Sequence, residues 1–159
     1  MTITIARATP ADMPHVMSAL RALADDLGDA FNATTAQVEA ALFGPHPIVR
    51  AQLALGAGQV LGLAYYSPMF STSLGAGGCY VSDLWTAPAA RGQGLGVQLL
   101  GAVARDAGAV WQAQFIKLAA YSDNSAALAF YTKLGFESLT GETALRLTAD
   151  RLQALGERQ

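Results

Sequence analysis

The segment Arg91-Gly92-Gln93-Gly94-Leu95-Gly96 places three glycines in six residues, between a strand expected over 79–86 and a helix expected over 94–107. Glycine has no Cβ, so the backbone of such a turn can approach a ligand closely. The first N–H groups of the following helix have no partner within the helix and point outward. Such a turn binds phosphate through these amides and the helix dipole, and Arg91 adds a positive charge at its mouth.

Glycine-rich turns also occur in nucleotide-binding motifs and in simple helix caps. A dinucleotide-binding fingerprint requires G-x-G-x-x-G after the first strand of a parallel unit, with an acidic residue about 20 residues later. A P-loop requires a Gly-Lys-Ser/Thr sequence, which does not follow here. A left-handed turn that only caps the helix accounts equally well for this segment taken alone.

The rest of the chain alternates strand and helix patterns. The expected elements are a strand at 3–5, helices at 10–27 and 35–42, strands at 48–55 and 60–66, a loop at 70–78, a strand at 115–121, a helix at 124–134, short strands at 136–139 and 144–148, and a helical tail at 150–155. Hairpins combined with crossover helices predict an α+β sheet with helices on both faces. No linker or repeat divides the chain, so a single domain over 1–159 is expected.

Composition excludes several classes of function. The chain has a net charge of −2 and only two lysines, whereas nucleic-acid binding requires clustered basic residues. A single cysteine excludes an intramolecular disulfide framework. One cysteine and two widely separated histidines also argue against a structural zinc site, so no metal is expected. No signal peptide and no apolar run of about 20 residues is visible, so a cytoplasmic protein without membrane contact is expected.

A second motif follows the glycine turn. The segment from Asn124 to Phe136 has the pattern Asn-x-x-Ala-x-x-x-Tyr-x-x-x-Gly-Phe, and Arg91 to Gly96 has the pattern Arg-x-x-Gly-x-Gly. Both patterns, in this order and on these elements, resemble the GNAT superfamily of acetyltransferases over essentially the whole chain. The resemblance implies a mixed, mostly antiparallel sheet with a splayed pair of central strands. It also implies acetyl-CoA as the cofactor.

The resemblance assigns the cofactor-binding residues by their place in the two motifs. The strand before the turn would pair with the pantetheine arm, the turn would hold the pyrophosphate, and the second motif would contact the cofactor at its helix start. The residues are Leu84, Trp85, Thr86, Arg91, Gly92, Gln93, Gly94, Leu95, Gly96, Val97, Asn124, Ser125, Ala126 and Tyr131. Asn124 is also a good helix cap, and the two roles are compatible.

Two residues are predicted to be catalytic. Tyr131 matches the family's tyrosine near the cofactor sulfur, where a phenol with a pKa of about 10 is protonated and can donate to the leaving thiolate. It could also be an ordinary half-buried helix aromatic. Asp83 is the nearest carboxylate on the strand beside the thioester, so it is predicted as the base or the substrate anchor.

Within the superfamily the chain looks most like the spermidine/spermine and thialysine acetyltransferases. The stretches that carry this resemblance are Leu42 to Pro47, Leu63 to Tyr66, and Tyr80 to Leu84 leading into the glycine turn. That group has a Glu-Asp pair where this chain has Ser82-Asp83, so either Asp83 acts through water or the substrate is not a polyamine. Asp25 and Asp26 lie where the group's first helix contributes to amine binding, although acidic residues at a helix end are often only solvated. The predicted substrate-binding set is therefore Asp25, Asp26, Ser82 and Asp83.

The predicted function is transfer of acetyl from acetyl-CoA to a primary amine of a small molecule, polyamine-like or amino-acid-like. The first alternative is acetylation of a peptide or protein N-terminus. The second is an acyl-CoA-binding module without turnover, which the missing glutamate favours and the intact Tyr131 opposes. A homodimer is compatible with the resemblance, because the resembling group dimerises.

Overall fold

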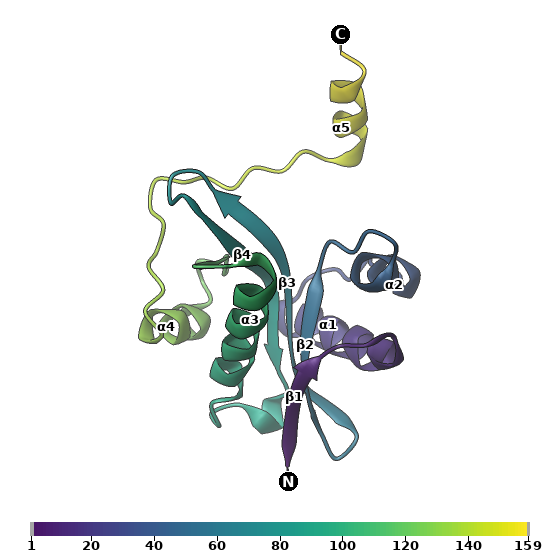
Figure 1. Ribbon diagram of the computed structural model, residues 1–159, viewed down its shortest axis with the longest axis vertical. Helices are drawn as coiled ribbons and strands as arrows, with labels where there is room; N and C mark the ends of the chain where they lie inside the picture. The colour runs from purple at the N-terminus through teal and green to yellow at the C-terminus, as the bar shows by residue number, and fades with distance from the viewer. Residues whose placement is uncertain (1, 159) are drawn as a thin grey trace. The chain divides into compact units, whose positions relative to one another are not determined.

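The computed structural model describes residues 2–158, and it divides into two compact units. The first unit ends at Ala119 and the second begins at Ala120. Figure 1 shows the helices and strands of both units.

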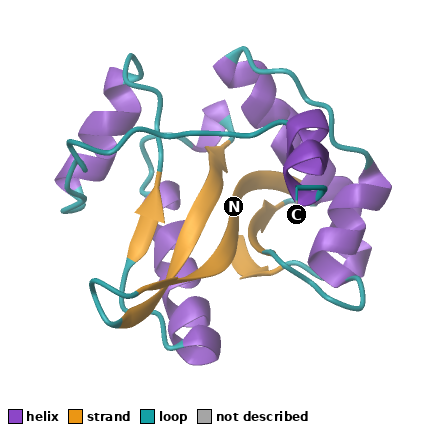
Figure 2. Cartoon of the chain, turned by 90° about the horizontal axis from the view of Figure 1, so that it is seen from above, coloured by secondary structure: helices purple, strands orange, loops and turns teal. Residues whose placement is uncertain are grey.

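A five-stranded sheet forms the centre of the first unit. Its strands lie in chain order and are β1 (Ile3–Arg7), β2 (Arg50–Gly56), β3 (Gln59–Ser71), β4 (Ala76–Thr86) and β5 (Ile116–Leu118). The first four strands are antiparallel neighbours, and β5 is parallel to β4. A parallel pair requires a crossover, which helix α3 (Leu95–Trp111) supplies. The view from above in Figure 2 shows the twist of this sheet.

Alternation along β3 sends side chains to both faces of the sheet, as period-two geometry requires. Leu63 packs on one face with the apolar side of helix α1 (Met13–Leu27), in a core that includes Val16 and Leu20. On the other face α3 lies so close to Gly62 that a Cβ there would stand 2.8 Å from the Leu99 Cδ1 atom. Helices therefore cover both faces, as expected from the sequence.

The helix boundaries follow capping chemistry. A short 3₁₀ helix (Pro10–Asp12) leads into α1, and Thr9 and Asp12 form a capping box at its start. Helix α1 ends at Gly28, whose φ of 72° is the left-handed conformation that glycine adopts without strain. Helix α2 (Thr35–Phe43) begins after Thr34, whose hydroxyl accepts a hydrogen bond from the Gln37 N–H.

The loop predicted over 70–78 is wrong. Strand β3 continues to Ser71 and β4 begins at Ala76, which leaves a turn of only four residues. Small residues are typical of loops, but here glycines lie in the strand because neighbouring groups approach its backbone too closely for a Cβ atom. A Cβ on Gly78 would lie 2.4 Å from the Phe115 ring, and one on Gly77 would lie 2.8 Å from the Trp111 carbonyl oxygen.

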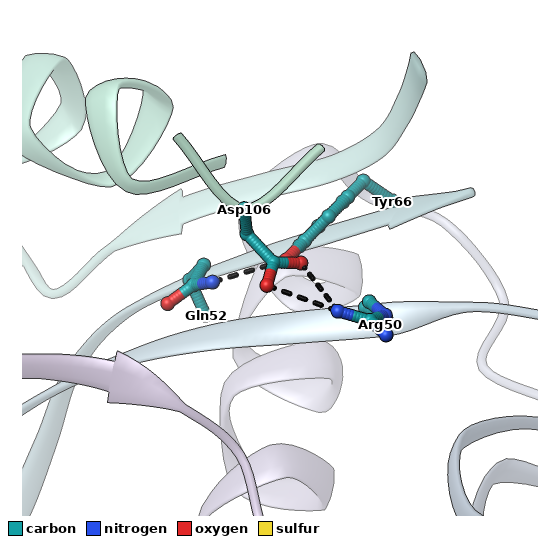
Figure 3. Close-up of polar contacts among 4 residues, drawn as sticks. All are labelled: Arg50, Gln52, Tyr66 and Asp106. Atoms are coloured by element: carbon teal, nitrogen blue, oxygen red, sulfur yellow. Dashed lines mark hydrogen bonds and ion pairs between the residues drawn. The ribbon is translucent and has the colours of Figure 1, made fainter. Parts of the chain in front are cut away.

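A partly buried polar network holds α3 to the sheet (Figure 3). The Tyr66 hydroxyl donates to Asp106 Oδ2 at 2.6 Å and accepts from the Gln52 side-chain amide at 3.0 Å. Arg50 Nη1 donates to both Asp106 oxygens at 3.0 Å. Burial, with the Asp106 carboxylate beside it, raises the pKa of Tyr66, so the hydroxyl stays a donor. The network fixes α3, the helix that begins at the glycine turn.

The second unit contains helices α4 (Ser125–Lys133) and α5 (Ala149–Gly156). The helix predicted over 124–134 and the helical tail are confirmed. The strands predicted over 136–139 and 144–148 are wrong, because these residues are in neither strand nor helix. An apolar alternating pattern becomes a strand only with a neighbour to bond, and this unit has no strand among its described residues. Residues 137–158 are all exposed.

Candidate active site

Strand β4 leaves its neighbour β5 halfway along its length. The two strands pair at three positions, Cys79↔Ile116, Tyr80↔Lys117 and Val81↔Leu118. From Asp83 to Thr86, β4 pairs with β3 and with no other strand of residues 2–158. The register also shifts here, since Tyr65 faces Asp83 and Tyr66 faces Val81, which leaves Ser82 as the extra residue of a β-bulge. A bulge bends its strand, and here it coincides with the splay.

The glycine turn lies between Ala90 and the start of α3. Gly92 and Gly94 have φ values of 75° and 78°, and no atom stands within 4 Å of a Cβ built on either. No side chain caps the first amides of α3, and its first turn contains no acidic residue. The positive end of the α3 dipole, the amides without a side-chain cap and the open space are all features that favour an anion at this turn.

Arg91 and Asp26 contact each other, although the sequence predicts different partners for them. Arg91 Nη2 forms an ion pair with Asp26 Oδ2, and Arg91 Nε donates to the Thr86 carbonyl at 3.1 Å. The Trp85 indole N–H donates to the same Asp26 oxygen at 3.0 Å. From the sequence, Asp26 is expected to bind substrate and Arg91 to bind the cofactor. In the structure, the Arg91 charge is already paired with Asp26. Asp25, which precedes Asp26 in the sequence, is exposed.

Asp83 is a half-buried carboxylate directly after the bulge. Ser82 Oγ donates to Asp83 Oδ2 at 2.7 Å. Burial raises the pKa of Asp83, and the hydrogen bond from Ser82 opposes this rise. A carboxylate whose pKa lies above its ordinary value holds a proton more strongly, and is therefore a better base near neutral pH. The predicted pair Ser82-Asp83 is thus in contact.

Tyr65 lies opposite Asp83, and the sequence motifs do not single it out. Burial and the nearby Asp83 charge raise its pKa to about 12, so the phenol remains protonated and can act as a hydrogen-bond donor. The signal that could have found it is the hairpin register, because pairing 60–66 with the following strand brings a tyrosine to Asp83.

In the second unit, Asn124 caps α4 as predicted. Its side-chain oxygen accepts from the Ala127 N–H at 3.1 Å, and Ser125 and Ala126 follow it as exposed residues. Tyr131 packs edge-on between the rings of Phe130 and Phe136, with ring centroids 5.2 and 5.4 Å away. Burial raises the pKa of Tyr131, which keeps its hydroxyl protonated. Its place near the cofactor sulfur stays a prediction.

The sequence profile of the Acetyltransferase (GNAT) family matches residues 17–136, about three quarters of the chain. The chain belongs to the GNAT family. It is therefore an acetyl-CoA-dependent acetyltransferase. No curated protein sequence matches this acetyltransferase.

Solved structures support the fold. An integron cassette protein from the mobile metagenome of V. cholerae is 26% identical, with 99% of both chains covered and a TM-score of 0.79. An aminoglycoside acetyltransferase from an uncultured soil metagenomic sample is 19% identical, with 93% and 100% covered and a TM-score of 0.76. The aminoglycoside N-acetyltransferase AAC(6')-Iy in complex with CoA is 15% identical, with 92% and 95% covered and a TM-score of 0.74. The predicted GNAT fold is confirmed.

The residues present fit acetyl-CoA. The open space at Gly92 and Gly94 admits a pyrophosphate close to the backbone, and the unpaired edge of β4 offers hydrogen bonds to an extended chain. Between residues 2 and 158 no three His, Cys, Asp or Glu side chains are grouped to hold a metal. Within the same range, no helix has both the length and the apolar character to cross a bilayer.

Proposed function

We propose that this acetyltransferase transfers acetyl to a primary amine of a small cationic molecule that carries several amines. The observation that carries the proposal is the environment of Asp83. This half-buried carboxylate has a raised pKa and lies at the point where β4 leaves β5. Two of the similar solved structures are named aminoglycoside acetyltransferases. Aminoglycosides and polyamines share the chemistry of several protonated amines, so both fall within the proposed class.

When bound, acetyl-CoA supplies an activated acetyl thioester. In the proposal, the amides at Gly92 to Val97 hold the pyrophosphate through backbone N–H groups. The open edge from Leu84 to Thr86 holds the pantetheine arm, because no strand within residues 2–158 pairs with its backbone on that side. In the proposal, the cofactor is also bound by residues at the start of α4, which are Asn124, Ser125 and Ala126. Gln93 and Leu95 belong to the turn that holds the pyrophosphate.

Two side chains move protons in the proposed reaction. Asp83 takes a proton from the acceptor ammonium, directly or through a water, because only the neutral amine is a nucleophile. Tyr131 Oη donates a proton to the departing thiolate. Ser82 holds the Asp83 carboxylate in place through its 2.7 Å hydrogen bond. Asp25 is the exposed carboxylate of α1 that remains available to attract a cation.

The narrower spermidine/spermine assignment is part of this proposal. It is supported by the resemblance over Leu42 to Pro47, over Leu63 to Tyr66 and over Tyr80 to Leu84. Ser82 stands in place of a glutamate, which favours acceptors that need one carboxylate near the reacting amine. The polyamines therefore form one arm of the test and do not define the class.

The test is thiol release from acetyl-CoA with a panel of acceptors. The panel contains polyamines, aminoglycosides, lysine-like amino acids and peptides with free N-termini. We expect saturable release with at least one small polyamine or aminoglycoside. Release with peptides alone would instead establish an N-terminal acetyltransferase, and CoA binding without release for any acceptor would establish a binding module.

We also propose that the chain forms a homodimer. The second unit exposes apolar side chains that solvent-facing segments rarely keep, with Leu145 exposed by 90%. The exposed leucines beyond residue 136 are Leu139, Leu145, Leu147, Leu152 and Leu155. A second copy of this chain would remove them from water. Segment 137–158 supplies 22 residues, and one side of a stable interface uses about 20–30.

A further inference from the structure

One carboxylate oxygen links three parts of the first unit. Asp26 lies near the end of α1, and its Oδ2 accepts hydrogen bonds from the Trp85 indole and from the Arg91 guanidinium. Arg91 Nε donates in turn to the Thr86 carbonyl oxygen. The end of β4 and the entry to the glycine turn are thereby tied to each other and to α1. We call Asp26, Trp85 and Arg91 the Asp26 clamp.

The clamp acts on a segment that is costly to order. Gly92 and Gly94 lose more conformational freedom on folding than other residues would. Binding a ligand to a mobile turn costs additional ordering free energy, and fixing the turn beforehand removes this cost. Arg91 is the residue directly before Gly92, so its contacts with Asp26 and Thr86 fix the position at which the glycine turn begins.

The charge balance of the clamp also limits what Arg91 can do. The Arg91 guanidinium is compensated by Asp26, and it is also held by a backbone carbonyl. A pyrophosphate at the turn would then be recognised by backbone amides and the α3 dipole and less by a free side-chain charge. Similarly, Asp26 Oδ2 already accepts two hydrogen bonds, which leaves this oxygen less available to an ammonium group.

We propose that Asp26 is a positioning residue for cofactor binding, acting through Trp85 and Arg91 on the end of β4 and on the glycine turn. The inference rests on the proposed placement of the pyrophosphate at that turn. It replaces the predicted role of Asp26 as an acceptor-amine ligand. Its effect is on affinity for CoA and not on the affinity for the amine.

The Asp26–Arg91 ion pair of the clamp contributes little to global stability. The Asp26 and Arg91 side chains are 39% and 50% exposed, and an exposed ion pair contributes about 0–1 kcal/mol. Trp85 is buried, so its indole N–H does need an acceptor. Asp26→Asn keeps an acceptor oxygen for Trp85 and removes the charge that holds Arg91. Asp26→Ala removes both the hydrogen-bond acceptor of Trp85 and the charge partner of Arg91.

The experiment measures CoA binding by calorimetry in these two variants. We expect Asp26→Asn to weaken CoA binding about threefold to tenfold and Asp26→Ala to weaken it further. Backbone amide exchange over 91–97 should be faster in Asp26→Ala than in the wild type. Glu39→Gln is the matched control, because it removes an exposed carboxylate from α2 and should change neither quantity. The thermal midpoint verifies that each variant is folded.

A second pair of variants tests the route through Arg91. In an Arg91→Gln background, Asp26→Asn should have little further effect on CoA binding, because the two residues act as one unit. CoA affinity unchanged within about twofold in Asp26→Ala overturns the inference. So does a raised KM for the amine with an unchanged CoA dissociation constant, because that result makes Asp26 an acceptor anchor.

The binding measurement needs no acceptor, so it is independent of the acceptor panel. If the panel contains no substrate while the Asp26 variants lose CoA affinity, the acceptor class is wrong and the role of Asp26 stands. If the variants bind CoA like the wild type while amines are acetylated, the acceptor class stands and the role of Asp26 is wrong.

Discussion

Asp83 combines burial with a hydrogen-bonded neighbour, and this combination sets a pH dependence. Its pKa lies above the ordinary value of 3.8, so the carboxylate is protonated below that raised pKa and becomes a base above it. The kcat/KM for the amine should therefore rise with pH through the raised pKa of Asp83. Asp83→Asn should lose this acid limb and lower kcat/KM by about 10²–10⁴. A pH profile of thiol release measures both.

Ser82 gives the matched variant for this prediction. Its hydroxyl lowers the pKa of Asp83 against the effect of burial. Ser82→Ala should thus raise the pKa of Asp83 further and move the acid limb to higher pH. An acid limb that persists unchanged in Asp83→Asn would show that the titrating group is another residue.

Tyr131 is the second side chain with a proposed proton transfer. Tyr131→Phe preserves the edge-on contacts with Phe130 and Phe136 and removes only the hydroxyl. We expect kcat to fall about 10²-fold, with the dissociation constant for CoA changed by less than about twofold. Steady-state rates and calorimetry separate the two. A wild-type kcat in this variant would exclude Tyr131 as the general acid.

The glycine turn is the next larger unit, and its conformation makes a specific demand. Gly94→Val places a β-branched side chain at φ 78°, which costs about 1–3 kcal/mol, and fills the space proposed for the pyrophosphate. CoA affinity should fall about 10-fold or more. Gly58→Val is the control, since Gly58 has φ 74° and open surroundings in the turn between β2 and β3. It should be destabilised similarly while binding CoA normally.

Helix α3 depends on the polar network of Figure 3 for its position. Asp106→Ala leaves the buried Tyr66 hydroxyl without its acceptor and the Arg50 guanidinium without its partner. The free energy of unfolding should fall by about 2–4 kcal/mol. Arg105→Ala on the exposed side of α3 should change it by less than about 0.5 kcal/mol. Denaturant titration of both variants checks this difference.

The parts of the fold and site that depend on local chemistry could be predicted from the sequence. Positive φ at Gly94 and the side-chain cap at Asn124 follow from nearest neighbours along the chain. Contacts between distant residues could not be predicted. Asp26 and Arg91 are 65 residues apart, and no local pattern indicates that they pair. The length of β4 could not be predicted either, because the close contacts of Gly77 with Trp111 and of Gly78 with Phe115 join residues distant in the sequence.

A further prediction concerns how the protein assembles. In the proposed homodimer, apolar residues of the second unit are removed from water by a second copy. The double variant Leu145→Asp, Leu147→Asp should therefore weaken self-association about 10-fold or more, which sedimentation over a range of concentrations measures. Ala144→Asp adds one charge at a neighbouring exposed position where little apolar area is lost, and should have a smaller effect. A wild-type chain that sediments as a monomer at all concentrations would contradict the proposal.

The proposed acetyl transfer to a small polyamine-like acceptor would use the glycine turn, the open edge of β4 and Asp83 in one reaction. Mass spectrometry of such an acceptor, after incubation with acetyl-CoA and the wild-type protein, tests this reaction at its product. We predict an acceptor carrying one added acetyl group, and far less of it with Asp83→Asn. An unmodified acceptor, with acetyl found only on peptide N-termini, would contradict the proposed function.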